Sequence, residues 1–140
     1  MKHSKKVWYA PNKHEAYGEE EIKAVEQCLR DGWLAGFGPR SVEFEEKIAK
    51  EFGKKYGVFV NSGSSACLLS LAALDLPKGT KVLTPALTFS TTLAPIIQLG
   101  YVPVFIDSNL TSYVPDIDDI IEAITDDIKV IMIPNLIGNK

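Results

Sequence analysis

The spacing of hydrophobic residues along the chain changes at about residue 56. Before that point, apolar residues recur three or four positions apart over 19–31 and over 42–52, which predicts two amphipathic helices. Gly32 supplies the end of the first helix, and Ser41 and Gly53 are the N-cap and the C-terminal cap expected for the second. The first part of the chain is therefore predicted to be helical.

From residue 56 onward, short apolar runs alternate with helical patterns. Strands are expected at 58–61, 81–84, 102–106 and 129–133, and helices at 65–74, 90–99 and 117–124. Asp116 is the N-cap expected for the last helix, whereas Pro95 either limits the middle helix to its first turn or kinks it. Apolar strands joined by helices are typical of a mainly parallel sheet with both faces covered. The predicted fold class is therefore α/β, a three-layer sandwich.

The turn Gly63-Ser64-Ser65 follows the first predicted strand and opens a helix. A helix start presents unpaired backbone N–H groups and the positive end of the helix dipole. Small residues let an anion approach these groups, and two hydroxyls add further donors. The turn lacks the spacing of a P-loop or of a dinucleotide fold. Two interpretations stay open: a phosphate site, or a turn that needs small residues only for packing.

Phe89 lies in a Thr- and Ser-rich loop after the next strand, at the edge of the sheet where ligands bind. Its ring either lies flat against a planar heteroaromatic ligand or packs in the core. Asp107 and Asn135 end two further strands, and each either faces a ligand or satisfies its own loop. A phosphate and a flat ring together describe pyridoxal 5′-phosphate or a nucleotide.

Composition narrows the classes of partner. The 140 residues are 46% hydrophobic and 24% charged, with a formal net charge of -3, which argues against a nucleic-acid partner. No apolar run approaches the roughly 20 residues needed to cross a bilayer. Cys28 and Cys67 are far apart, and neither they nor His3 and His14 have the spacing of metal ligands. We therefore expect a cytoplasmic protein with no metal and no membrane partner.

Six segments follow one another in a recognisable order. They are Gly32-Trp33-Leu34, Gly38-Pro39 with Val42 and Phe44-Glu45, and the segments 61–66, 84–89, 102–107 and 133–138. In this order they resemble the DegT/DnrJ/EryC1/StrS sugar aminotransferases over 18–138. The resemblance implies the large domain of the type I, aspartate aminotransferase-like fold of pyridoxal phosphate enzymes. It also implies a homodimer that acts on a nucleotide-linked keto sugar with an amino donor.

The resemblance assigns roles to particular residues. It implies that Gly63, Ser64 and Ser65 bind the phosphate of pyridoxal 5′-phosphate and that Phe89 stacks on the pyridine ring. The loop that starts at Trp33 would lie near the substrate entrance or a dimer contact. Asn135 stands where many members of the family have a histidine, so it is a second candidate for a substrate or interface residue.

The resemblance also implies a domain layout. Residues 1–35 would form an N-terminal arm and helix, and residues 36–140 the N-terminal half of the cofactor-binding large domain. The rest of that domain and a small domain are expected beyond Lys140, together with the Schiff-base lysine and the acidic partner of the pyridinium nitrogen. We therefore expect a fragment of a longer protein and assign no catalytic residue in this chain.

Three functions remain open on these grounds. The first is a pyridoxal phosphate-dependent aminotransferase that moves an amino group from glutamate or a similar donor to a nucleotide-linked keto sugar. The second is a sugar 3-dehydratase of lipopolysaccharide deoxysugar biosynthesis, because the segment 134–139 also resembles the branch that includes such enzymes. The third, from another class, is a non-catalytic module that binds phosphate or a nucleotide.

We expect the 140 residues alone to catalyse no transamination, because none of the assigned residues can shuttle a proton at the amino-bearing carbon. The measurement is an assay of the purified chain with pyridoxal phosphate, glutamate and a keto-sugar nucleotide. Formation of an amino sugar would contradict the expectation.

Overall fold

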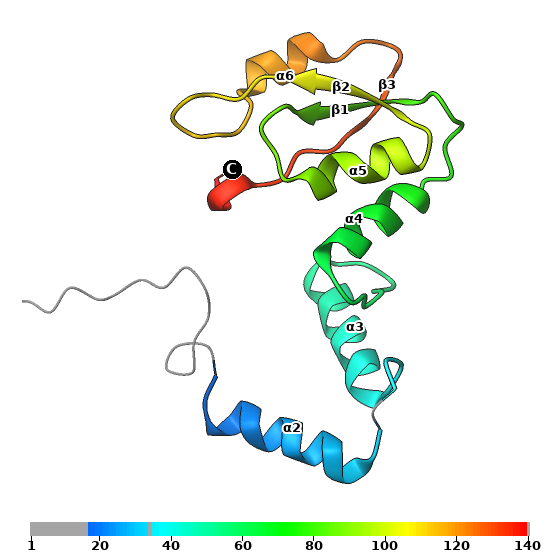
Figure 1. Cartoon of the computed structure of the whole chain (residues 1–140), viewed down its shortest axis with the longest axis vertical. Coiled ribbons are helices and arrows are strands. Elements are labelled where there is room, and N and C mark those ends of the chain that lie inside the picture. Colours follow the sequence, from blue (N-terminus) through cyan, green and yellow to red (C-terminus); the bar gives the residue numbers. More distant parts are fainter. Residues whose placement is uncertain (1–16, 34, 140) are drawn as a thin grey trace, which may run out of the picture. The chain divides into compact units, whose positions relative to one another are not determined.

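The computed structural model describes residues 17–33 and 35–139, and the chain divides into two compact units between Phe59 and Val60 (Figure 1). The elements in chain order are α2 (Glu19–Asp31), α3 (Pro39–Glu51), α4 (Gly63–Ala72), β1 (Lys81–Pro85), α5 (Ser90–Gln98), β2 (Val102–Ile106), α6 (Ile117–Ala123), β3 (Ile128–Ile131) and the short 3-10 helix η1 (Leu136–Gly138).

The first unit contains α2 and α3. The predicted bounds of α2 are confirmed, and Gly32 ends the helix in the left-handed conformation, with φ 71° and its N–H donating to Leu29 O. The predicted start of α3 is wrong, because the helix begins at Pro39 and not after Ser41. The fixed φ of proline suits the first position of a helix. The hydroxyl of Ser41 donates instead to Gly36 O, at 3.1 Å.

The strand predicted at 58–61 is also wrong: the structure has no strand there. The backbone N–H of Phe59 donates to Glu45 Oε1 at 2.7 Å, and its ring meets that of Phe44 edge to face, with centroids 5.4 Å apart. A strand needs a neighbour that completes its hydrogen-bond ladder, and no segment within 17–33 and 35–139 pairs with these residues. Their β-branched composition is compatible with a strand but does not supply a partner.

The second unit is built on a three-stranded sheet in the order β2-β1-β3. Both neighbours of β1 run parallel to it, which confirms the predicted parallel α/β fold. Leu83, at the centre of β1, faces Val104 on one side and Ile131 on the other. The strands predicted from 81, 102 and 129 are therefore present, with ends shifted by one or two residues.

Helices cover the sheet from both sides. Figure 1 shows α5 and α6 on opposite faces, and α4 packs against α5. The core beneath α5 consists of Leu71, Val82, Ile96 and Tyr101, all buried. Pro95 does not end α5 at its first turn, because the helix continues to Gln98. The loss of one backbone donor at Pro95 is thus tolerated in a helix that is held by its packing.

Thr84 is a polar residue within this core. It is fully buried in β1, at 0% exposure, and its hydroxyl has no hydrogen-bond partner among the described residues. A buried hydroxyl without a partner destabilises the folded state, because it loses its hydrogen bonds to water and gains none in exchange.

We predict that Thr84→Val raises the free energy of unfolding by about 1 kcal/mol, since valine has the same shape and no hydroxyl to desolvate. The measurement is denaturant unfolding of the chain. Thr80→Val is the matched control, because the Thr80 hydroxyl donates to Pro77 O at 2.6 Å. The control should lower stability, and a loss of stability in both variants would contradict the prediction.

Candidate functional site

The carboxyl ends of the parallel strands lie at one edge of the sheet. The N–H of Ala86, just after β1, donates to Ile106 O at the end of β2, at 2.9 Å. On the other side of β1, the N–H of Met132 donates to Leu83 O at 2.8 Å. The chain leaves β1, forms β2 on one side and then β3 on the other, and ligands of open parallel sheets bind where the strand order reverses in this way.

Helix α4 begins with a local hydrogen-bond cluster that the sequence analysis did not assign. Ser62 is the N-cap, and its Oγ accepts the backbone N–H of Ser65 at 3.1 Å. The hydroxyl of Ser65 donates in turn to Asn61 Oδ1 at 2.7 Å. The available signal was a serine placed three residues before a small polar residue at the start of an apolar helix.

Two backbone donors remain open at this helix start. Within the described part of the chain, the N–H groups of Gly63 and Ser64 have no hydrogen-bond partner. A Cβ added at Gly63 would meet nothing within 4 Å, and Ser64 is exposed, so an anion can approach both groups. The start of α4 therefore fits a phosphate group, which needs close donors and accessible space.

A groove lies beside these residues, between α4 and α5. Its volume is about 190 Å³, and it is lined by Ser64, Ser65, Leu68, Thr91, Ala94, Pro95 and Gln98. Pockets that enclose whole drug-sized ligands are larger, from about 300 Å³ upward. The groove is therefore suited to one end of a ligand and not to a complete cofactor.

Phe89 lies at the N-cap position of α5, in the loop that follows β1. Its side chain is 70% exposed, so it does not pack in the core. Phe89 is not among the residues that line the groove between α4 and α5. The structure thus leaves its ring accessible, and stacking on a ligand stays a prediction.

The two strand-end residues of the sequence analysis form local turns. Asp107 Oδ1 accepts the N–H of Ser108 at 2.8 Å, which stabilises the turn after β2. Asn135 is exposed and precedes η1, where its carbonyl oxygen accepts the N–H of Gly138 at 3.0 Å. Neither of these hydrogen bonds involves the side-chain amide of Asn135. Its role as a substrate or interface residue therefore also stays a prediction.

Buried hydroxyl groups gather at the same strand ends. Thr84 near the end of β1, Thr88 in the following loop and Ser108 after β2 each carry a buried hydroxyl without a partner among the described residues. Buried hydroxyls without a partner are uncommon in native structures. The carboxyl edge of the sheet therefore has more hydrogen-bonding capacity than the described residues use.

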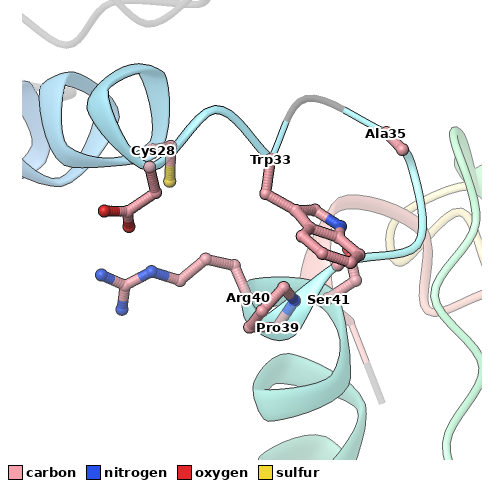
Figure 2. A pocket seen from close by; sticks show the side chains of 8 residues that line it. Cys28, Trp33, Ala35, Pro39, Arg40 and Ser41 are labelled. Carbon is pink, nitrogen blue, oxygen red and sulfur yellow. The ribbon is translucent and has the colours of Figure 1, made fainter.

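Trp33 belongs to the first unit and lies in the loop between α2 and α3. Its side chain is 57% exposed, and its Nε1 donates to Phe37 O at 2.9 Å. Figure 2 shows the indole on the wall of a cavity whose opposite side includes Cys28. Trp33 is therefore accessible at the surface of the first unit, and its role as a substrate or interface residue stays a prediction.

Neither a metal site nor a membrane-spanning helix is present in residues 17–33 and 35–139. No group of three or more His, Cys, Asp or Glu side chains there is arranged to hold a metal ion. No helix in that part combines the length and the apolar composition that crossing a bilayer requires.

Comparison with known proteins gives consistent matches. A model of the DegT/DnrJ/EryC1/StrS aminotransferase family matches residues 15–140. The chain is 39% identical over 125 residues to a GDP-4-keto-6-deoxy-D-mannose 3-dehydratase of Escherichia coli O55:H7, over 85% of this chain and 32% of the relative. It is 35% identical over 117 residues to a UDP-4-amino-4-deoxy-L-arabinose–oxoglutarate aminotransferase of Shewanella sediminis, over 84% of this chain and 30% of the relative.

Solved structures agree with these matches. The Escherichia coli GDP-4-keto-6-deoxy-D-mannose 3-dehydratase with bound hydrated PLP has a TM-score of 0.77 and 36% identity, over 84% of this chain and 31% of that chain. An aminotransferase from Psychrobacter cryohalolentis, 24% identical with a TM-score of 0.74 over 90% of this chain and 31% of that chain, shares the fold. The chain thus spans about a third of the length of the relatives it matches.

We predict that Ser62 and Ser64 play different parts at the start of α4. Ser62→Ala removes the N-cap acceptor and should lower the free energy of unfolding by about 1 kcal/mol. Ser64→Ala, at an exposed hydroxyl without a described partner, should change it by less than about 0.5 kcal/mol. Denaturant unfolding of both variants checks this, and equal losses would show that Ser62 is not the cap.

Proposed function

The chain belongs to the DegT/DnrJ/EryC1/StrS aminotransferase family, and on that premise we propose that it is the cofactor-binding, amino-terminal part of a pyridoxal phosphate-dependent aminotransferase for a nucleotide-linked keto sugar. The family membership predicted from six sequence segments is confirmed by the match over 15–140. The observation that carries the proposal is the pair of open N–H groups at Gly63 and Ser64, in a chain similar to a protein with bound PLP.

The described residues fit the cofactor at two points. The start of α4 offers the N–H groups of Gly63 and Ser64 and the Ser64 hydroxyl to a dianionic phosphate, where the helix dipole also favours negative charge. The Ser65 hydroxyl donates to Asn61 Oδ1 at 2.7 Å, and its oxygen accepts the Ser62 hydroxyl at 3.1 Å, so Ser65 would support the phosphate site by ordering the start of the helix. Phe89 offers an exposed ring that can cover one face of the pyridine.

When bound, pyridoxal phosphate supplies an electron sink for the bonds around the amino-bearing carbon. The part of the chain described here contributes binding and orientation. The helix start would hold the phosphate, and the ring of Phe89 would cover one face of the pyridine and keep water from it. Both contacts would orient the bound cofactor.

Other parts of the proposal concern the whole protein. We expect glutamate or a similar amino acid as the amino donor, and a cytoplasmic homodimer as the assembled enzyme. Residues 1–35 would form the N-terminal arm and helix, and residues 36–140 half of the cofactor-binding large domain. Trp33 and Asn135 would contact the substrate or a dimer partner.

A sugar 3-dehydratase is the second candidate function. The observation in its favour is the 39% identity to the Escherichia coli GDP-4-keto-6-deoxy-D-mannose 3-dehydratase. The same cofactor would bind at the same residues, so the described site supports both reactions. Product analysis separates them, because a transaminase adds nitrogen to the sugar and a dehydratase removes an oxygen.

We predict that the chain binds pyridoxal 5′-phosphate at least tenfold more tightly than pyridoxal, which lacks only the phosphate. Equilibrium dialysis with absorbance detection measures both affinities. Equal affinities would contradict a phosphate site. Tight binding of a nucleotide with no binding of pyridoxal phosphate would favour the non-catalytic module.

Variants test which residues cause the preference for pyridoxal 5′-phosphate over pyridoxal. Gly63→Val places a branched side chain where the anion approaches and should remove the preference for the phosphorylated form. Phe89→Ala should lower the affinity for both ligands by about tenfold and leave the preference for the phosphorylated form intact, since the ring would contact the pyridine and not the phosphate. Phe89→Tyr is the matched control, because it keeps an aromatic ring.

A further inference from the structure

Asn61 is the exposed residue before the N-cap of α4, and the proposed function gives it no role of its own. Its Oδ1 accepts the hydroxyl of Ser65 at 2.7 Å. The Ser62 hydroxyl donates to Ser65 Oγ at 3.1 Å, and Ser62 Oγ accepts the N–H of Ser65 at 3.1 Å. The hydroxyl protons of both serines are therefore used within the chain, and Asn61 is the last acceptor of the series.

This series determines which donors an anion can reach. The N–H and the hydroxyl of Ser65 are taken, whereas the N–H groups of Gly63 and Ser64 and the Ser64 hydroxyl have no partner among the described residues. Within the same part of the chain, the side chain of Asn61 has hydrogen bonds to Ser62 and Ser65 only. Asn61 thus orders the first turn of α4 and leaves its open donors free.

The segment around this helix start carries no charge. Residues 57–74 include no Asp, Glu, Lys, Arg or His. The groove between α4 and α5 is also lined by neutral residues alone. An anion at the start of α4 would therefore be stabilised by backbone N–H groups, a hydroxyl and the helix dipole, with no cationic side chain from 57–74. One additional negative charge there would have a large effect on its affinity.

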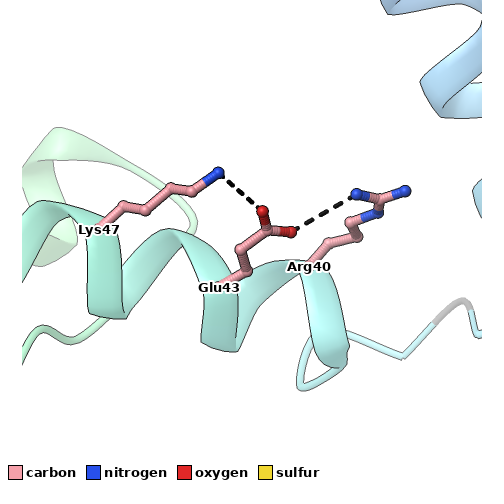
Figure 3. A network of polar contacts seen from close by, with 3 residues as sticks. All are labelled: Arg40, Glu43 and Lys47. Carbon is pink, nitrogen blue, oxygen red and sulfur yellow. Dashed lines mark hydrogen bonds and ion pairs between the residues drawn. The ribbon is translucent and has the colours of Figure 1, made fainter.

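A carboxylate of the first unit shows the opposite arrangement. Figure 3 shows Glu43 of α3 between Arg40 and Lys47, with its Oε2 3.5 Å from Arg40 Nη1 and its Oε1 2.7 Å from Lys47 Nζ. The hydrogen bond from Lys47 is the main cause that lowers the pKa of Glu43. A carboxylate in place of Asn61 would have no such cation within 57–74, so its charge would act on a neighbouring anion.

For the stability of α4 alone, aspartate would be the better residue at position 61. A carboxylate accepts a hydroxyl in a charge-assisted hydrogen bond, which is stronger than the bond to an amide. Negative charge is also favoured at the start of a helix. Asparagine has nearly the same shape and offers the same acceptor without the charge.

We propose that Asn61 is a specificity residue that keeps the start of α4 selective for a phosphate dianion, because it orders Ser65 with a neutral acceptor. The inference rests on the proposed function, which supplies the phosphate. It also assigns a trade-off between stability and function to this position, since the residue that would stabilise the helix more would repel the ligand.

The test compares Asn61→Asp with the unaltered chain by equilibrium dialysis against pyridoxal 5′-phosphate and pyridoxal. Asn61→Asp should lower the affinity for pyridoxal phosphate at least tenfold and change that for pyridoxal by less than about twofold. It should also raise the thermal midpoint of the unliganded chain by about 2 °C. A preference for the phosphorylated form that persists in Asn61→Asp would overturn the proposal. A lower thermal midpoint would do the same, because the weaker binding would then reflect a disordered helix start.

Two further variants separate charge from structure. Asn61→Ala should lower the thermal midpoint by about 2 °C and change the preference by less than about threefold, since it adds no charge and frees the Ser65 hydroxyl to donate. Ala73→Glu is the matched control, because it adds a carboxylate at an exposed residue about 15 Å from Gly63 along the axis of α4. The control should keep the preference.

Either of two results from these variants would contradict the proposal. Equal loss of the preference in Asn61→Ala and Asn61→Asp would identify the amide itself, and not its neutrality, as the cause. Loss of the preference in Ala73→Glu would show that the position of the added charge does not matter.

Inorganic phosphate separates this inference from the proposed function. Compared with sodium chloride at equal ionic strength, phosphate should raise the thermal midpoint of the unaltered chain and not that of Asn61→Asp. This result without any binding of pyridoxal phosphate would count against the proposed function alone. An equal preference for pyridoxal phosphate in the unaltered chain and in Asn61→Asp would count against the inference alone. An unaltered chain that responds to neither ligand would count against both.

Discussion

The hydrogen-bond ladders on both edges of β1 are the constraint on which the candidate cofactor site depends. Because β1 pairs with β2 on one side and β3 on the other, the chain must emerge from all three strands at the same edge. Val82 and Leu83 are fully buried, so β1 cannot shift its register without exposing one of them or burying a polar neighbour. The position of the loop that carries Phe89 follows from this pairing.

Features that depend on adjacent residues were mostly predicted correctly, whereas the strand that needs a distant partner was not. The bounds of α2 and the role of Gly32 follow from a few adjacent residues, and both are as predicted. The segment 58–61 has the composition of a strand, yet its partner is not specified by its own sequence, and Phe59 bonds to Glu45 instead. The predicted start of α3 is too late, because the prediction relied on Ser41 as the N-cap, whereas proline suits the first turn of a helix and Pro39 begins it.

Serine side chains can either cap a helix or bind an anion, and this limits what could be predicted of the candidate site. Small residues at 63–65 pointed to an accessible helix start, and the structure has one. Which donors stay available depends on the N-cap, since Ser62 takes the N–H of Ser65 and Asn61 takes its hydroxyl. Serine side chains cap helices and bind anions with the same atoms, so composition alone does not divide these tasks. Only the hydrogen-bond geometry does so.

The similarity of one chain to both a dehydratase and an aminotransferase has a physical explanation under the proposed function. Holding a phosphate and covering a pyridine ring stabilise the bound cofactor to the same extent in either reaction, so they do not select between the products. Selection requires groups that move protons or expel a leaving group at the substrate. Gly63, Ser64 and Phe89 can do neither, because backbone N–H groups, an unactivated hydroxyl and a hydrocarbon ring do not exchange protons near neutral pH. Under the proposed function, this part of the protein would therefore determine which cofactor is bound and would leave the reaction to residues of another kind.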